Sequence, residues 1–152
     1  MFKKNHLMKD KNRLSLLIWF RLARFYQESN QLSHLHLRKF SISVSQFDVL
    51  VQIMTHQPIS QKELGAKLLV TKGGVTQMLA RLEKDGLIER SQTWRTKLIS
   101  LTDSGQKILN LSLPEQSDFQ ASMFDCLDEE EKKQFLNTLR KLNQHIQKKT
   151  LE

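Results

Sequence analysis

The feature that most constrains this chain is a pair of short helical segments between residues 60 and 86. Ser60 opens the first segment, and Glu63 three residues later completes a capping box. Thr71 is the expected N-cap of the second segment, and Gly86 ends it as a C-cap. Two helices joined by so short a connection must pack across one another, which predicts a helix-turn-helix.

The sequence on either side extends this unit. Upstream, Ser45 is the expected N-cap of an apolar helix that Pro58 ends. Downstream, Leu87 to Glu89 and Lys97 to Leu101 are expected to form two short strands around the polar turn 91–95. A small hairpin that follows two short helices is the layout of a helix-turn-helix with a wing.

An N-terminal helix is apolar on more than one side. Its main stripe has helical spacing, and Trp19 and Phe20 lie off that stripe; the stripe consists of Leu14, Leu17, Ile18, Leu22 and Phe25. Such a helix must be covered on more than one side. In a chain of 152 residues, we expect the second cover to be another subunit.

The C-terminal part of the sequence also indicates a second subunit. Thr102 and Asp103 are expected to open a long helix that is bent or interrupted near Pro114. A further helix begins at Asp128, which forms a capping box with Glu131, and apolar residues repeat at coiled-coil-like spacing at Phe135, Leu139, Leu142 and Ile146. This apolar seam also needs a partner, so the sequence predicts a homodimer.

Net charge favours a polyanionic partner. Lysine and arginine number 24 against 16 aspartates and glutamates, a net charge of +8, which nucleic acid or an anionic membrane would fit. No run approaches the roughly 20 apolar residues of a membrane span, so none is expected. The single cysteine, Cys126, excludes an intramolecular disulfide and fits a reducing compartment, which predicts a cytoplasmic protein.

The helix that follows Thr71 has two distinct faces. Its core face has the spacing i, i+3, i+4, i+7 and consists of Val75, Met78, Leu79 and Leu82. The opposite face suits a DNA major groove, because glutamine can bond an adenine edge and lysine or arginine can reach phosphate or guanine; it carries Gly73, Gln77, Ala80 and Lys84, flanked by Lys72, Thr76 and Arg81. Gly73 and Gly74 would let backbone N–H groups approach a phosphate.

The order and spacing of these segments resemble the MarR family of winged helix-turn-helix regulators. The resemblance covers roughly residues 44 to 112 and rests on the runs 45–50, 59–64, 70–76, 81–90 and 99–105, which read SQFDVL, ISQKEL, VTKGGVT, RLEKDGLIER and ISLTDSG. It implies a mainly α fold, with about six helices, a small β-hairpin wing, and N- and C-terminal helices that form a dimerisation region. It also implies a homodimer that binds a pseudo-palindrome with half-sites ~10 bp apart.

Within a single domain of residues 1–152, residues 44–101 would form the DNA-binding part, and residues 10–40 and 103–149 the dimerisation helices. The expected DNA contacts come from the two short helices and the wing: Ser60, Gln61, Thr71, Lys72, Gly73, Gly74, Thr76, Gln77, Arg81, Arg95 and Lys97. Arg95 matches the wing arginine that enters the minor groove. The wing departs from the family in being short and in having Trp94 where an acidic residue is common, and Trp94 would pack under the wing or against the sugar-phosphate backbone.

Other candidate sites are weaker. The resemblance implies a possible small-molecule effector, such as a phenolic or lipophilic ligand, or else an oxidant or a metal. A thiol sensor needs a lowered pKa, but the acidic neighbours of Cys126 would raise the pKa of its thiol. We therefore expect Cys126 to be buried and inert and not to act as a sensor. A metal site is not predicted from the histidines, which are His6, His34, His36, His56 and His145. No cofactor and no enzyme activity are expected, because the catalytic motifs of the common hydrolases are absent.

The sequence therefore predicts a sequence-specific DNA-binding transcription regulator, a repressor that an effector relieves. The alternative is a winged-helix module that binds a protein partner and not DNA. Two features favour that alternative: the groove-facing side of the helix after Thr71 has few charges, and the wing is unusual.

Overall fold

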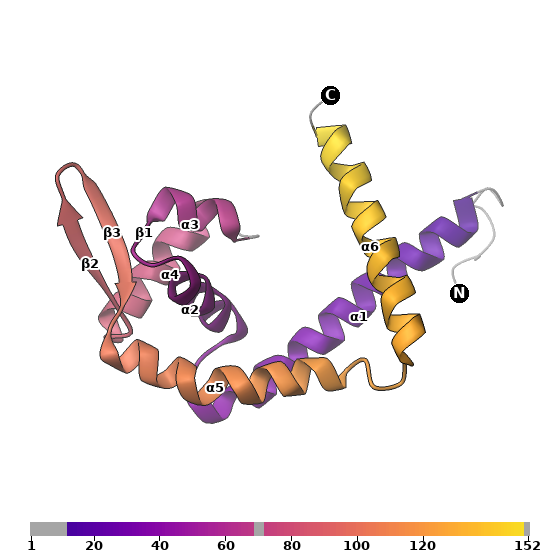
Figure 1. The fold of residues 1–152 in the computed structure, drawn as a ribbon, viewed down its shortest axis with the longest axis horizontal. Coiled ribbons are helices and arrows are strands. Elements are labelled where there is room, and N and C mark those ends of the chain that lie inside the picture. Colours follow the sequence, from indigo (N-terminus) through magenta and orange to yellow (C-terminus); the bar gives the residue numbers. More distant parts are fainter. Residues whose placement is uncertain (1–11, 69–71, 151–152) are drawn as a thin grey trace, which may run out of the picture. The chain divides into compact units, whose positions relative to one another are not determined.

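Helices make up most of the chain, and three short strands form one sheet (Figure 1). The computed structural model describes residues 12–68 and 72–150. Its contacts divide the chain into two units, with the boundary between Gln116 and Ser117. In chain order the elements are α1 (Arg13–Leu37), the 3-10 helix η2 (Arg38–Phe40), α2 (Val44–His56), β1 (Ile59–Ser60), α3 (Gln61–Lys67), α4 (Lys72–Lys84), β2 (Ile88–Thr93), β3 (Thr96–Leu101), α5 (Asp103–Ser122) and α6 (Glu129–Thr150).

Ser43, and not Ser45, caps α2. The Ser43 hydroxyl accepts a hydrogen bond from the backbone N–H of Gln46 at 3.1 Å, and the Gln46 side chain accepts one from the Ser43 N–H at 2.9 Å. The expectation for Ser45 was wrong because only Ser43 has a glutamine three residues later, as the capping box requires. Ser45 lies inside the first turn of α2.

The predicted ends of the two short helices are confirmed where the structure describes them. Ser60 caps α3 through a capping box with Glu63. Gly86 has a φ of 71° and follows the end of α4, where its N–H donates to the Glu83 carbonyl and the Leu87 N–H donates to the Leu82 carbonyl. This pair of hydrogen bonds is a Schellman motif, for which glycine is the preferred residue. Thr71 lies outside the described residues.

One hydrophobic core joins the elements of the first unit. Every helix from α1 to α5 contributes to it, and so do all three strands; the buried residues include Leu37, Leu50, Ile53, Ile59, Leu64, Leu79, Leu82, Ile88, Ile99 and Leu109. The predicted core face of α4 is confirmed, with Val75, Leu79 and Leu82 buried and Met78 packed against the core. The N-terminal part of α5 closes against this core through Leu109.

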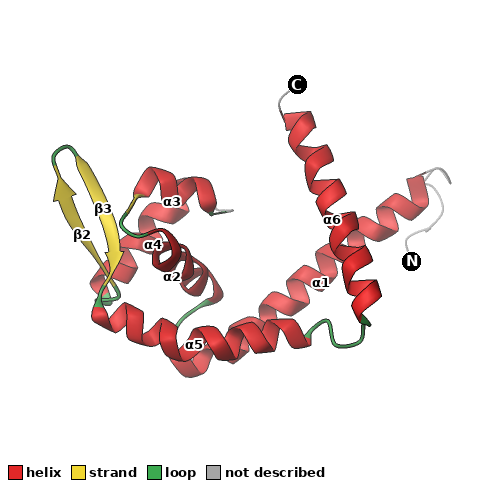
Figure 2. Cartoon of the chain, in the orientation of Figure 1, coloured by secondary structure: helices red, strands yellow, loops and turns green. Residues whose placement is uncertain are grey.

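The wing is longer than the sequence indicated. The sheet is antiparallel with the order β1-β3-β2, and β2 pairs with β3 from Ile88↔Leu101 to Thr93↔Thr96. Residues 91–93 belong to β2, so only Trp94 and Arg95 form the turn. The expected longer turn was wrong because a ribbon that projects beyond the helices, as Figure 2 shows, has no buried face that would impose an apolar pattern. The short strand β1 was not predicted.

Three C-terminal expectations have mixed outcomes. We expected a bend or an interruption near Pro114, and the interruption is wrong because α5 continues through Pro114; this residue is exposed, and the helix tolerates the missing N–H. The capping box at the start of α6 is confirmed, because the Glu131 N–H donates to Asp128 at 2.8 Å and the Asp128 N–H donates to Glu131 at 2.9 Å. Cys126 is exposed and not buried, because it lies in the turn between α5 and α6.

Helix α1 leaves much of its apolar surface uncovered in the single chain. The exposed fractions are 67% for Trp19 and 61% for Phe20, and Leu14, Ile18 and Tyr26 are also exposed. None of the helices within residues 12–68 and 72–150 has the length and hydropathy needed to cross a membrane. An amphipathic helix with this much bare apolar surface is typical of a protein–protein interface.

Gly105 is a position where any side chain should destabilise the fold. An added Cβ would lie 2.0 Å from the Leu87 carbonyl oxygen, so the backbone would have to move. We expect Gly105→Ala to lower the free energy of unfolding by about 1–3 kcal/mol, as overpacking does. Gly65→Ala is the control, because nothing lies within 4 Å of its added Cβ, and in α3 alanine should stabilise by about 1 kcal/mol. Urea denaturation measures both, and equal midpoints would contradict this packing.

Candidate nucleic-acid interface

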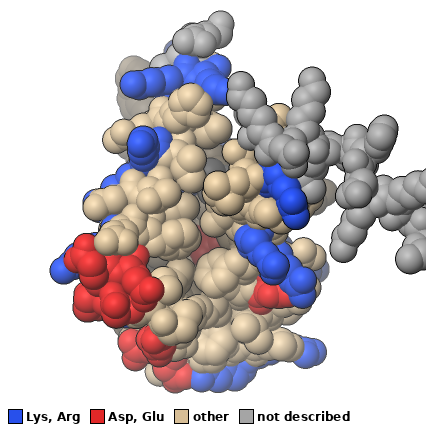
Figure 3. All heavy atoms as spheres, turned by 90° about the vertical axis from the view of Figure 1, so that its right-hand side faces the viewer, with Lys and Arg blue, Asp and Glu red and all other residues tan. Residues whose placement is uncertain are grey.

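Charge alone does not locate the binding surface. Helix α6 begins with Glu129–Glu131 and ends with Lys148 and Lys149 in its last turn. On the face drawn in Figure 3, acidic side chains gather in the lower half of the view, whereas lysines and arginines are spread from top to bottom. Because this face carries both signs, we located the candidate interface from the exposed residues of α3, α4 and the wing.

Burial of one side of α4 exposes the side that the sequence assigned to DNA. Val75, Leu79 and Leu82 are buried, so the residues between them must face solvent. The exposed residues of α4 are Gly73, Thr76, Gln77, Ala80, Arg81, Glu83 and Lys84, and Gly74 is partly exposed. Lys72 is the first residue of α4, and its side chain is not among those described.

A hydrogen bond joins the predicted contacts of α3 and α4. The Gln61 side-chain amide donates to the Thr76 hydroxyl at 2.8 Å, although the two residues lie 15 positions apart. Gln61 begins α3 and Thr76 lies in the second turn of α4. The bond therefore holds the start of α3 beside the exposed face of α4, and it uses one lone pair of the Thr76 hydroxyl.

Ser60 is occupied with the capping of α3. Its hydroxyl donates to a Glu63 carboxylate oxygen at 2.7 Å, and its backbone N–H donates to the same oxygen at 3.0 Å. The hydroxyl hydrogen bond is the larger cause, and the backbone hydrogen bond the second, of a Glu63 pKa that lies below its ordinary value. Ser60 thus positions α3 and stabilises the charged form of Glu63.

Arg81 is an exposed cation on the described face of α4. Its side chain is 76% exposed, and its Nε lies 3.8 Å from an Asp85 carboxylate oxygen. An exposed ion pair at this distance contributes little to stability, so Arg81 can leave Asp85 for a phosphate at small cost. The sequence placed Arg81 at the flank of the working face, and the structure is consistent with that position.

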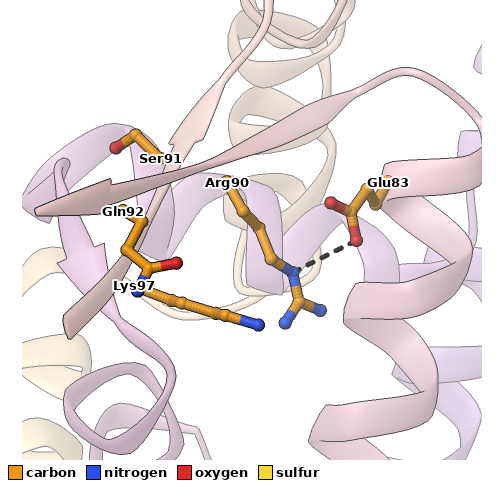
Figure 4. Close-up of a pocket in the computed structure, with 5 residues that line it drawn as sticks. All are labelled: Glu83, Arg90, Ser91, Gln92 and Lys97. Atoms are coloured by element: carbon orange, nitrogen blue, oxygen red, sulfur yellow. Dashed lines mark ion pairs between the residues drawn. The ribbon is translucent and has the colours of Figure 1, made fainter. Parts of the chain in front are cut away.

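An ion pair ties the wing to α4. Arg90 of β2 lies 3.1 Å from a Glu83 carboxylate oxygen of α4, and the Arg90 side chain is only 25% exposed. The two residues line a hollow of about 430 Å³ together with Ser91, Gln92 and Lys97, and Figure 4 shows Arg90 and Glu83 pointing toward each other across it. The pair restricts the angle between wing and helix, and Lys97 adds a further positive charge to this surface.

Trp94 and Arg95 form the tip of the wing. Trp94 has a φ of 60° and is 89% exposed, so it does not pack under the wing. The Arg95 guanidinium carbon lies 6.0 Å from the centroid of the Trp94 ring, which is the range of a cation–π contact. The turn therefore presents an indole and a guanidinium side by side at the end of the ribbon.

A polar cluster lies in the contact between α1 and α5. His36 Nδ1 lies 2.8 Å from the Gln116 side-chain oxygen, and Lys39 forms an ion pair with Glu115. Gln116 and Ser112 are completely buried, yet the Gln116 amide nitrogen and the Ser112 hydroxyl have no hydrogen-bond partner among the described residues. Buried polar atoms of this kind usually bond to something, which makes the cluster a candidate ligand site.

The histidines do not come together with other ligating residues in the described chain. No group of three or more histidine, cysteine, aspartate or glutamate side chains that could hold a metal ion occurs within residues 12–68 and 72–150. His6 lies outside these residues. A metal effector therefore has no candidate site among the residues that the structure describes.

Sequence comparison connects this geometry to known regulators. The model of the MarR family matches residues 42–93. A Bacillus cereus protein described as an uncharacterized HTH-type transcriptional regulator is 50% identical over 145 residues, which cover 95% of this chain and 98% of that protein. The match to this relative thus extends over almost the whole of both chains.

Structural comparison gives the same result. A mutant MarR from E. coli complexed with operator DNA superimposes with a TM-score of 0.78 at 26% identity, covering 89% of this chain and 99% of the other. A complex of S. aureus MepR with DNA has a TM-score of 0.77 at 27% identity, covering 84% of this chain and 96% of the other. Both proteins are therefore similar to this chain in fold and, at this identity, in sequence.

The lowered pKa of Glu63 is directly testable. Ser60→Ala removes the larger of its two hydrogen bonds, so the Glu63 pKa should rise toward the ordinary glutamate value of about 4.3. Ser60→Thr keeps the hydroxyl and serves as the control. NMR titration of the Glu63 side chain measures both variants, and an unchanged pKa in Ser60→Ala would show that the hydroxyl has no such effect.

The sign of the pH dependence follows from the direction of this shift. Because the pKa is lower in the folded state, the hydrogen-bonded carboxylate stabilises the protein above the unfolded-state pKa. This stabilisation is lost as the pH falls through the folded-state pKa. As the pH falls through this range, the free energy of unfolding should therefore decrease less in Ser60→Ala than in the wild type.

Proposed function

The chain belongs to the MarR family of transcriptional regulators, and we propose that it represses transcription by binding a pseudo-palindromic operator as a homodimer. The observation that carries this proposal is the exposed polar face of α4, which lies beside a wing tipped by Arg95. A helix of this width fits the major groove, and a β-ribbon tip can reach the adjacent minor groove. That the protein represses and does not activate transcription is a prediction from the sequence.

Each candidate residue has a proposed role on DNA. Gln77 and Thr76 would read base edges in the major groove, and Arg81 would bind phosphate or guanine. Arg95 would enter the minor groove. The remaining proposed contacts bind the sugar-phosphate backbone or position the two helices, and they are Ser60, Gln61, Thr71, Lys72, Gly73, Gly74 and Lys97.

Dimerisation is proposed through the terminal helices, residues 10–40 and 103–149. The bare apolar surface of α1, which includes Trp19 and Phe20, supports this proposal. A second copy would cover that surface and would place two α4 helices about one turn of DNA apart, ~10 bp. The winged part, residues 44–101, would then contact DNA from each subunit.

We further propose a small-molecule effector that binds the polar cluster between α1 and α5. The buried Gln116 amide nitrogen and Ser112 hydroxyl lack partners among the described residues, and a ligand with a carbonyl or carboxylate oxygen would accept from both. Leu109 and Leu113 precede Ser112 and Gln116 by three residues each on α5 and belong to the core or pack against it, which suits a ligand with a hydrophobic body.

The remaining predictions concern a protein-interaction role, enzyme activity and the cellular location. A protein-interaction module without DNA binding is not favoured, because the relatives are transcriptional regulators and two similar structures hold DNA. The relatives are described as regulators and not as enzymes. A cytoplasmic location stays a prediction, supported by the need of such a regulator to reach its DNA.

Removing either of the arginines proposed to contact DNA should weaken DNA binding in a salt-dependent manner. We expect Arg81→Ala and Arg95→Ala each to reduce affinity for DNA upstream of the protein's own gene, and to lower the slope of log affinity against log salt by about 1. Lys133→Ala removes an exposed charge from α6 and should leave both quantities unchanged. Fluorescence anisotropy at several salt concentrations measures them, with scrambled DNA for selectivity. A wild-type protein without preference for its upstream DNA would contradict the proposed function.

The dimer proposal predicts that one charge on α1 should separate the subunits. Light scattering should give the wild type about twice its chain mass of 17.9 kDa. Phe20→Glu should give monomers of unchanged helicity, because Phe20 is 61% exposed within one chain, and these monomers should lose most operator affinity. Thr55→Glu adds the same charge at an exposed position of α2, outside the proposed dimerisation helices, and is the control. A Phe20→Glu variant that remains dimeric would place the interface elsewhere.

A further inference from the structure

The backbone at the wing tip is in a conformation that tryptophan rarely adopts. Thr93 and Thr96 pair across the ribbon, so the loop has only two residues. The positive φ of 60° falls on the first of them, Trp94, which is the pattern of a type II′ turn. Glycine is the usual residue there, because a Cβ is strained at positive φ.

The indole gains nothing from the fold that would offset this strain. Trp94 is 89% exposed, and its ring lies within cation–π distance of the Arg95 guanidinium, which is also exposed. A positive φ at a residue other than glycine costs free energy, and strained positions of this kind cluster at binding and active sites.

We propose that Trp94 is a DNA-contacting residue that packs its indole against the deoxyribose faces of the minor groove into which Arg95 inserts. This inference rests on the proposed operator binding and adds an uncharged, shape-reading contact to it. Because the guanidinium carbon lies 6.0 Å from the centroid of the indole ring, an Arg95 that enters the groove brings the Trp94 indole to the groove wall.

The chemistry of the pair suits this location. The walls of a minor groove expose apolar sugar atoms between phosphates, and apolar side chains are common in minor-groove contacts. Aromatic rings contribute to DNA affinity without neutralising phosphate, so they add nothing to counterion release. The cation–π contact with Trp94 also restricts the Arg95 side chain before binding, so less conformational entropy is lost when Arg95 binds DNA.

Substitution at Trp94 should therefore separate binding from stability. Asparagine tolerates positive φ, so Trp94→Asn should leave the urea midpoint unchanged or raise it. The same variant should bind operator DNA about tenfold more weakly, with the salt slope of the wild type. Trp94→Phe should restore most of the affinity, because it keeps an aromatic face. Arg95→Ala differs by lowering the salt slope as well.

Fluorescence gives a second, independent readout. The chain has two tryptophans, so the difference between the emission of the wild type and that of Trp94→Phe gives the emission of Trp94 and leaves α1 unchanged. Operator DNA should shift the Trp94 emission and protect it from acrylamide, and scrambled DNA at equal concentration should do so much less. An indole that packs against sugars must lose solvent contact on binding.

Failure of the proposed Trp94 contact and failure of the proposed operator binding give different results. If the wild type prefers operator DNA but Trp94→Asn binds within twofold of it, or if the Trp94 emission and acrylamide access do not change, the assignment of Trp94 is overturned. If the wild type shows no preference for operator DNA, the proposed function itself fails. A tenfold loss at unchanged salt slope and unchanged stability supports the assignment.

Discussion

Leu79 and Leu82 are completely buried in the winged core, and the arrangement of the candidate interface depends on this burial. Because a helix has a fixed period, burying these two side chains determines that Gln77 and Arg81 face solvent. The Gly86 turn then starts the wing directly after α4, and the pair between Glu83 and Arg90 restricts its direction. Loss of the core contacts would therefore disorganise the DNA-facing residues without altering any of them.

Local signals predicted the parts of the fold that local physics controls. The capping boxes at Ser60 and Asp128 and the glycine at position 86 are confirmed, because each hydrogen bond joins residues close in the sequence. The wing was harder to delimit, since a solvated ribbon lacks an apolar pattern. Cys126 was wrongly expected to be buried because its exposure depends on the turn between two helices and not on its own apolar character.

The same division applies to the candidate site. Helical periodicity placed the α4 residues on one exposed face, but their contact with DNA stays a prediction. The bond between Gln61 and Thr76, the pair between Glu83 and Arg90, and the buried cluster around Gln116 were not foreseen. Each depends on residues brought together by tertiary packing, for which a single sequence contains no periodic signal.

The order of the sheet has a consequence for aggregation. Strand β3 is central, so β2 and the two-residue β1 are the edges. An unpaired strand edge can add strands from other molecules, but β1 is too short to do so, and β2 carries polar or charged residues from Glu89 to Thr93. Edge-to-edge growth of fibrils is therefore disfavoured, and the ribbon can project into solvent even at high protein concentration. Self-association is then left to the exposed apolar surface of α1.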